Sequence, residues 1–107
     1  MIPVMSVTAL ADGEMTACRV EGVEILVCRV DGRFYACANR CTHAGQALHT
    51  GRLRGWRLGC PLHGAWFDVR DGRCLQPPAE VGLVTYPVLI ERGRVQVDVR
   101  RPRPPAG

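Results

Sequence analysis

The chain has 107 residues, the length of one domain, and its apolar share of 47% is ordinary for a globular protein. Its formal net charge is +4, but its basic residues, all arginine, are scattered along the chain, which argues against a nucleic-acid-binding face. No run approaches the ~20 apolar residues of a membrane-spanning helix, and the N-terminal residues do not resemble an export signal. We therefore expect a cytoplasmic protein with no nucleic-acid or membrane partner.

Short apolar runs alternate with turn signals along most of the chain. The runs at 23–30, 33–38, 83–90 and 94–99 are rich in β-branched and other apolar residues. Asp-Gly, Glu-Gly or Arg-Gly pairs adjoin most of them, and such pairs favour tight hairpins. No long stretch has a helical period with caps at both ends. The pattern predicts an all-β fold with an antiparallel base that resembles a sandwich or barrel.

Residues 40–64 interrupt this rhythm. They contain five glycines, all three histidines and two of the six cysteines. That composition is typical of two loops with a hairpin between them. Because loops held on a rigid scaffold commonly carry function, this segment is where we expect the functional site.

Two Cys–His pairs lie in this segment. One residue separates Cys41 from His43, two separate Cys60 from His63, and sixteen lie between the pairs. Four N/S ligands suit a structural zinc ion, although the common zinc patterns order their ligands differently. They also suit two irons bridged by sulfide, with thiolates on one iron and imidazoles on the other. Buried core thiols and hydrogen-bonded imidazoles without any metal are the third alternative.

This spacing resembles the signature of Rieske [2Fe–2S] proteins. The segments "CTHAG" and "CPLHG" resemble the two cluster-binding loops of that family. The segment "FDVRDGRCLQPPA" resembles the strand, turn and proline-bearing loop that follow them, and "VTYPVLIERGRVQV" is similar to the closing hairpin of the soluble members. The resemblance covers nearly the whole chain.

The resemblance implies a Rieske iron–sulfur fold, in which a small two-loop subdomain stands on the β base. We expect a Rieske [2Fe–2S] domain at residues 1–100, with the cluster-binding subdomain at about 39–75. Prolines after Val99 cannot extend a strand ladder, so residues 101–107 are predicted to form a flexible Arg/Pro tail.

The resemblance also implies one Rieske-type [2Fe–2S] cluster and its ligands. Cys41 and Cys60 would bind the inner iron, and His43 and His63 the outer iron. Further residues would surround the cluster or form the tip at which a partner docks, and these are Thr42, Ala44, Gly45, Leu62, Gly64, Trp66 and Pro77.

The chain departs from its quinol-oxidising relatives at four positions. Those relatives join the two loops by a disulfide, and Gln46 and Leu62 stand here at the corresponding positions. They also direct hydroxyl groups at the cluster sulfurs, where this chain has Ala65 and Phe67. Since hydrogen bonds to sulfur raise the reduction potential, we expect a low value, roughly −150 to 0 mV.

The function implied is that of a one-electron carrier rather than an enzyme. It would pass electrons from an NAD(P)H-dependent flavin reductase to a terminal oxygenase of the aromatic-ring-hydroxylating kind, and we expect it to be a monomer. The alternative within the family is the Rieske-like small subunit of NAD(P)H-dependent nitrite reductase. The alternative of another class is a zinc-stabilised binding module.

The remaining thiols and the third imidazole are not expected to bind metal. Cys18, Cys28 and Cys37 lie in or beside predicted strands and Cys74 follows a turn, so we interpret them as small buried hydrophobic residues. His49 is interpreted as a surface residue, because Cys41 and His43 already supply two ligands from their loop.

Overall fold

The computed structural model describes residues 1–42, 45–62, 64–76 and 81–106, and strands dominate these ranges. The strands are β1 (Ile2–Ser6), β2 (Met15–Val20), β3 (Val23–Val30), β4 (Arg33–Ala38), β5 (Arg52–Arg54), β6 (Arg57–Gly59), β7 (Trp66–Asp68), β8 (Cys74–Gln76), β9 (Thr85–Tyr86), β10 (Val88–Glu91) and β11 (Arg94–Val97). A short 3₁₀ turn, η1 (Leu48–Thr50), precedes β5. The prediction of an all-β fold is confirmed.

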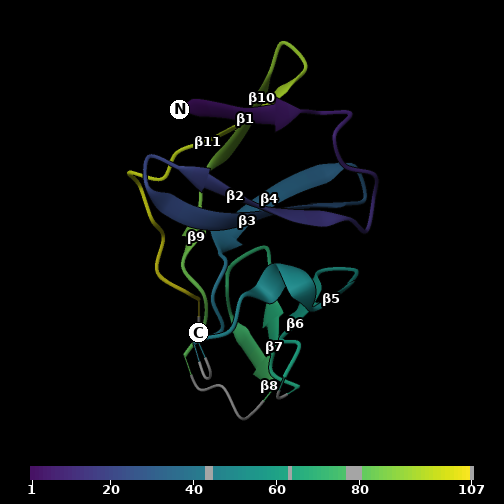
Figure 1. Ribbon diagram of the computed structural model, residues 1–107, viewed down its shortest axis with the longest axis vertical. Coiled ribbons are helices and arrows are strands. Elements are labelled where there is room, and N and C mark those ends of the chain that lie inside the picture. The colour runs from purple at the N-terminus through teal and green to yellow at the C-terminus, as the bar shows by residue number, and fades with distance from the viewer. Residues whose placement is uncertain (43–44, 63, 77–80, 107) are drawn as a thin grey trace.

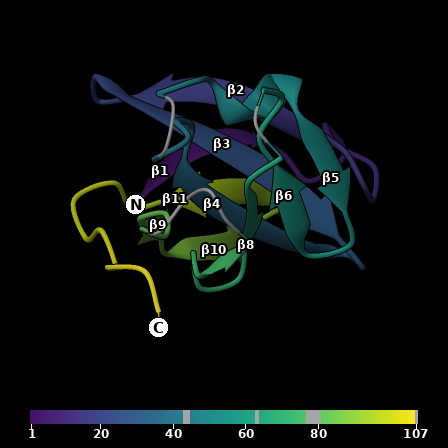
Figure 2. The ribbon, with the colours of Figure 1, turned by 90° about the horizontal axis from the view of Figure 1, so that it is seen from below.

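Three antiparallel sheets follow one another along the long axis of the molecule (Figure 1). The upper sheet has the order β1-β11-β10, the middle sheet β2-β3-β4-β9, and the lower sheet β5-β6-β7-β8. Seen from below, the lower sheet lies over the middle sheet (Figure 2). Within the described ranges, no helix is both long and apolar enough to cross a bilayer.

The turns between strands explain why these segments form hairpins. The β2–β3 and β3–β4 turns each consist of two residues, and φ is positive at both, for example 51° at Asp31 and 77° at Gly32. Two positive φ angles in succession match the twist of the flanking strands, and Gly accepts this conformation without strain. The hairpins predicted from the turn pairs are therefore confirmed here.

Strand β3 is buried on both faces and separates two apolar cores. Side chains alternate along a strand, so Ile25 and Val27 pack into the core shared with the upper sheet. Leu26 and Cys28 point the other way, into the core shared with the lower sheet. The lower core includes Cys41 and Cys60, the first residues of the two predicted loops, and Leu58 and Phe67 are among its fully buried members.

The run 83–90, expected as one strand, is divided between two sheets. Strand β9 pairs with β4 in the middle sheet, whereas β10 pairs with β11 in the upper sheet. Pro87 stands between them and lacks the amide N–H that a continuous ladder needs. The chain passes from one sheet to the other at this residue.

The C-terminal segment, predicted to be flexible, makes backbone contacts with the rest of the chain. The Arg103 amide donates to the carbonyl oxygen of Thr85 at 2.8 Å, and the Thr85 amide donates back to Arg103 at 3.1 Å. The Ala106 amide donates to the carbonyl oxygen of Asp71 at 3.0 Å. Arg103 lies between two prolines and supplies the amide that they lack.

Candidate metal centre

Two of the four predicted ligands lie in the described part of the chain. Cys41 follows β4 and Cys60 follows β6, each at the start of a loop, and each side chain is about 1% exposed. Both belong to the lower core. The structure therefore places the two thiols, which come from separate loops, in the same buried apolar core. The predicted site residues His43, Ala44, His63 and Pro77 lie outside the described residues.

The two loops close in the same way. The Cys41 amide donates to the carbonyl oxygen of Gln46 at 2.8 Å, and the Cys60 amide donates to the carbonyl oxygen of Ala65, also at 2.8 Å. In both loops the donor is the cysteine and the acceptor lies five residues further on. Each cysteine is therefore fixed at the same position of an equivalent loop, although the spacing to the predicted histidine differs.

A glycine in the left-handed conformation completes each loop. Gly45 has a φ of 68° and Gly64 a φ of 70°, and each lies four residues after its cysteine. A residue with a Cβ is strained at such angles, so the glycine allows the chain to turn back towards the acceptor carbonyl. This equivalence supports the prediction that both loops bind the same metal cofactor.

A buried amide anchors the first loop. Asn39, 2% exposed, accepts a hydrogen bond from the His49 amide at its Oδ1 (2.8 Å). Its Nδ2 donates to Nδ1 of the His49 ring at 2.9 Å. His49 is exposed, as predicted, yet its ring holds residue 39 to η1 on the far side of the loop. No sequence signal distinguished Asn39 from an ordinary polar residue after a strand.

The first loop also contacts the segment that begins at residue 81. The Thr42 hydroxyl donates to the carbonyl oxygen of Val81 at 2.5 Å. A hollow of about 410 Å³ borders this contact, and its lining includes Cys41, Gly45 and Pro105. The C-terminal segment thus reaches the same region as the first loop.

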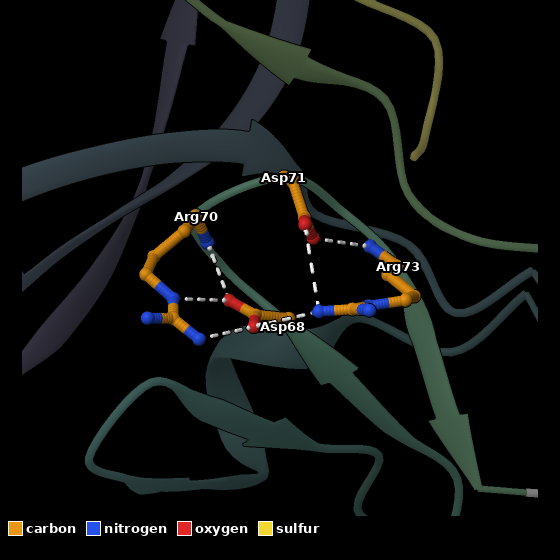
Figure 3. A network of polar contacts seen from close by, with 4 residues as sticks. All are labelled: Asp68, Arg70, Asp71 and Arg73. Carbon is orange, nitrogen blue, oxygen red and sulfur yellow. Dashed lines mark hydrogen bonds and ion pairs between the residues drawn. The ribbon is translucent and has the colours of Figure 1, made fainter. Parts of the chain in front are cut away.

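A buried carboxylate organises the turn between β7 and β8 (Figure 3). Asp68 is 3% exposed and accepts hydrogen bonds from Arg70 Nε at 3.0 Å and from Arg70 Nη2 at 2.8 Å. Arg73 Nη2 lies 3.9 Å from its Oδ2. The Arg70 hydrogen bond is the main reason why the pKa of Asp68 is lowered, against the opposing effect of burial.

The β7–β8 turn also positions the segment at 81–84. The Gly72 amide donates to the carbonyl oxygen of Asp68 at 2.7 Å, and the Gly72 carbonyl accepts from the Leu83 amide at 2.7 Å. Leu83 is fully buried in the lower core. A continuous set of contacts therefore runs from Asp68 through Leu83 to the residue, Val81, that holds Thr42.

The remaining predicted positions fall into three environments. Ala65 and Phe67 are fully buried and carry no hydroxyl. Leu62 is 59% exposed, at the tip of the second loop. Trp66 is half-buried in β7, and its ring lies against Gly59, where an added Cβ would come within 3.0 Å of the indole.

Two other thiols in the core, those of Cys28 and Cys37, are held in the neutral form. Burial raises the pKa of Cys28 to about 12 and also raises the pKa of Cys37. Both therefore stay protonated at neutral pH, whereas metals bind the thiolate. No group of three or more Cys, His, Asp or Glu side chains gathers within the described ranges, which include Cys41 and Cys60 but neither predicted histidine ligand. Two buried thiols, each at the start of a loop and both in the lower core, are compatible with the cysteine half of a mixed Cys/His centre.

Comparison with known proteins gives consistent results. The family described as Rieske [2Fe-2S] domain matches residues 1–87. The ferredoxin component of the naphthalene 1,2-dioxygenase system of Pseudomonas putida is 37% identical over 98 residues, which cover 92% of this chain and 94% of the relative.

Solved structures agree with the sequence matches. The ferredoxin of carbazole 1,9a-dioxygenase from Nocardioides aromaticivorans IC177 superposes with a TM-score of 0.87 at 32% identity, covering 90% of this chain and 94% of that one. A chain from a complex of reduced oxygenase and oxidized ferredoxin in carbazole 1,9a-dioxygenase gives a TM-score of 0.86 at 32% identity. That match covers 91% of this chain and all of the other.

Proposed function

The chain belongs to the Rieske [2Fe–2S] domain family, and on that premise we propose that it carries single electrons from an NAD(P)H-dependent flavin reductase to a terminal aromatic-ring-hydroxylating oxygenase. The observation that supports this most is the pair of equivalent loops, which place Cys41 and Cys60 in the same buried lower core. A Rieske cluster, when bound, accepts and releases one electron. The protein is a carrier and not itself an enzyme.

The proposed ligands are two thiolates and two imidazoles. Cys41 and Cys60 would bind the inner iron, which agrees with their burial and with the matching hydrogen bonds of their amides. His43 and His63 would bind the outer iron. Their assignment depends on the sequence pattern, because both lie outside the described residues.

The surroundings of the second loop support a low reduction potential. Ala65 and Phe67 offer no hydroxyl at the positions where high-potential relatives direct one at sulfur. Fewer hydrogen bonds to the sulfurs leave the reduced, more negative state less stabilised. The expected potential is roughly −150 to 0 mV, and a redox titration well above +100 mV would contradict it.

The partners are assigned by analogy with the relatives. This chain is similar to a chain from a complex of oxygenase and ferredoxin, which supports an oxygenase as the electron acceptor. A reductase is proposed as the electron donor because the carrier needs an electron source. The proposed docking tip consists of the two loop ends, residues 42–45 and 62–64. We expect a monomer in the cytoplasm.

Electron paramagnetic resonance of the purified, dithionite-reduced protein tests the cofactor and its ligands. A rhombic signal with an average g below that of all-cysteine [2Fe–2S] ferredoxins, with about two irons per chain, is the expected result. His43→Gln and His63→Gln should each abolish that signal. His49→Gln is the matched control and should retain it, because His49 contacts Asn39 instead.

The same sample distinguishes the alternatives. One zinc per chain without acid-labile sulfide would exclude the electron-carrier function and assign the chain as a zinc-stabilised binding module. Reduction by a flavin reductase followed by electron transfer to an aromatic-ring oxygenase supports the ferredoxin assignment. Transfer only to a sirohaem enzyme would assign the chain as the small subunit of a nitrite reductase instead.

A further inference from the structure

The outward face of the lower sheet carries three arginines and one tryptophan. The register pairs Arg52 with Gly59 and Arg54 with Arg57, and Gly59 also pairs with Trp66 of β7. Directly paired residues of neighbouring strands lie on the same face of a sheet, and faces alternate along each strand. We refer to Arg52, Arg54, Arg57 and Trp66 as the arginine face.

This face is the solvent side of the sheet. Its three arginines are exposed, whereas Leu53, Leu58 and Phe67, on the opposite face, pack in or against the lower core. The arginines are separated in sequence by the turn at Gly55, so only the pairing of β5 with β6 brings them together.

Two of the arginines are stacked on the tryptophan. The guanidinium carbon of Arg52 lies 5.3 Å from the centre of the Trp66 ring, and that of Arg57 lies 4.9 Å from it. The indole itself is supported by Gly59, which leaves it room to lie across β6. Stacking holds a guanidinium in place while its N–H edge remains available for a carboxylate.

The charge of this face is not neutralised within the described part of the chain. There, no carboxylate lies within ion-pair distance of Arg52, Arg54 or Arg57. Asp68 pairs directly with Arg57 in the strand register, but its carboxylate is bound by Arg70 (Figure 3).

One of the contacts on this face is unfavourable for folding. Arg54 and Arg57 stand directly opposite each other across β5 and β6. Like charges in directly opposed positions destabilise a hairpin. Such local conflicts with folding are expected where residues serve a function.

The face also adjoins the proposed cluster loop. Gly59 immediately precedes Cys60, and Trp66 immediately follows Ala65, whose carbonyl closes that loop. A partner bound to the arginine face would therefore lie beside the second loop. Arginine and tryptophan are also the residues most enriched among the energetically important positions of protein interfaces.

We propose that the arginine face is a docking surface for a carboxylate-rich patch on an electron-transfer partner, an inference that rests on the carrier function proposed above. Carboxylates match its unpaired charge and the planar geometry of stacked guanidinium groups. Docking there supplements contacts at the loop tips and raises the rate at which an acidic partner meets the protein.

The oxidation of dithionite-reduced holoprotein by hexacyanoferrate(III) tests the face without an identified partner. Each reduced protein molecule gives up one electron, and one hexacyanoferrate(III) becomes hexacyanoferrate(II). The variant R52Q/R54Q/R57Q should slow this anionic oxidant roughly tenfold at low ionic strength. The control R19Q/R33Q/R94Q removes the same charge from exposed positions on the other two sheets and should slow it less than about threefold.

Poly-L-glutamate then serves as the probe for an acidic protein. It should slow oxidation of the wild type and of the control variant, and should have no effect on R52Q/R54Q/R57Q. Equal rates for the two triple variants would overturn the inference, because net charge alone would explain them. Stronger protection by a single-stranded oligonucleotide of equal charge would overturn the choice of a protein partner. A protein with no reducible cluster would instead refute the carrier function on which the inference rests.

Discussion

Asn39 and His49 are joined by two hydrogen bonds of opposite direction, the amide of His49 donating to Oδ1 and Nδ2 of Asn39 donating to the ring. The pair closes the first loop at its base. Because Asn39 is almost fully buried, Asn39→Ala leaves the His49 amide without its acceptor. We expect the free energy of unfolding to fall by about 1–3 kcal/mol.

The comparison variant for that prediction is His49→Ala. It removes the ring contact but keeps the backbone amide that donates to Asn39, so the expected loss is only about 0.5–1.5 kcal/mol. Urea unfolding of both variants gives the two values. An equal loss in both would show that the ring, rather than the backbone bond, holds the loop.

The Asp68 carboxylate predicts a pH-dependent contribution to stability. The Arg70 hydrogen bond lowers the pKa of Asp68 in the folded protein below its value in the unfolded chain. Its contribution is therefore fully present above the unfolded value of about 4, and is lost as the pH falls through the folded value. At neutral pH, Asp68→Asn should reduce the free energy of unfolding by about 1–3 kcal/mol.

Unfolding curves recorded between pH 7 and pH 3 check the sign of that effect. The difference between wild type and Asp68→Asn should shrink below about pH 4, because a protonated Asp68 resembles the neutral amide. Glu21→Gln is the surface control. Its partner Arg100 is largely exposed, so it should cost at most about 1 kcal/mol. A difference that stayed constant across the pH range would exclude ionisation of Asp68 as the cause.

Local signals explain why much of the base was predictable. The runs at 23–30 and 33–38 became β3 and β4 with the same bounds, because short apolar runs and the glycine turns that bound them are signals that act over a few residues. The run at 83–90 failed as one strand because Pro87 removes a single amide in its middle. That signal is also local and was available in the sequence.

The site was predictable only in part, for a physical reason. The two Cys–His pairs and the glycines around them were enough to predict two loops, and Cys41 and Cys60 each lie at the start of one. The contact of Thr42 with Val81 joins residues far apart in sequence and depends on how the sheets pack. The convergence of Arg54 and Arg57 likewise appears only once the register of the β5–β6 hairpin is known.

Gly72 should be among the residues least tolerant of substitution. Its φ is +78°, and an added Cβ would lie 1.9 Å from the carbonyl oxygen of Leu83. Gly13 is the matched control, with a φ of +86° but nothing within 4 Å. Gly13→Ala should therefore show backbone strain alone, about 1–2 kcal/mol.

Gly72→Ala should cost about 1–3 kcal/mol more than Gly13→Ala, because the backbone of Leu83 must move. Leu83 is close to Val81, which holds Thr42 of the first loop. The Gly72→Ala holoprotein should therefore also lose iron faster than the Gly13→Ala holoprotein, measured as the decay of visible absorption. An equal loss of unfolding free energy in the two glycine variants would mean that the backbone at Leu83 moves without destabilising the fold.

The bridge between Arg103 and Thr85 predicts that the C-terminal segment is held by its backbone and not by its charge. Arg103→Ala keeps the amide and should leave the free energy of unfolding unchanged within about 0.5 kcal/mol. Arg103→Pro removes the donor to Thr85 and should cost about 0.5–1.5 kcal/mol. Proteolysis of the segment, followed by mass spectrometry, should accelerate only in the proline variant. If the alanine variant were cleaved as fast, the guanidinium would be the anchor, and if wild type were cleaved as fast as both, the segment would be free in solution.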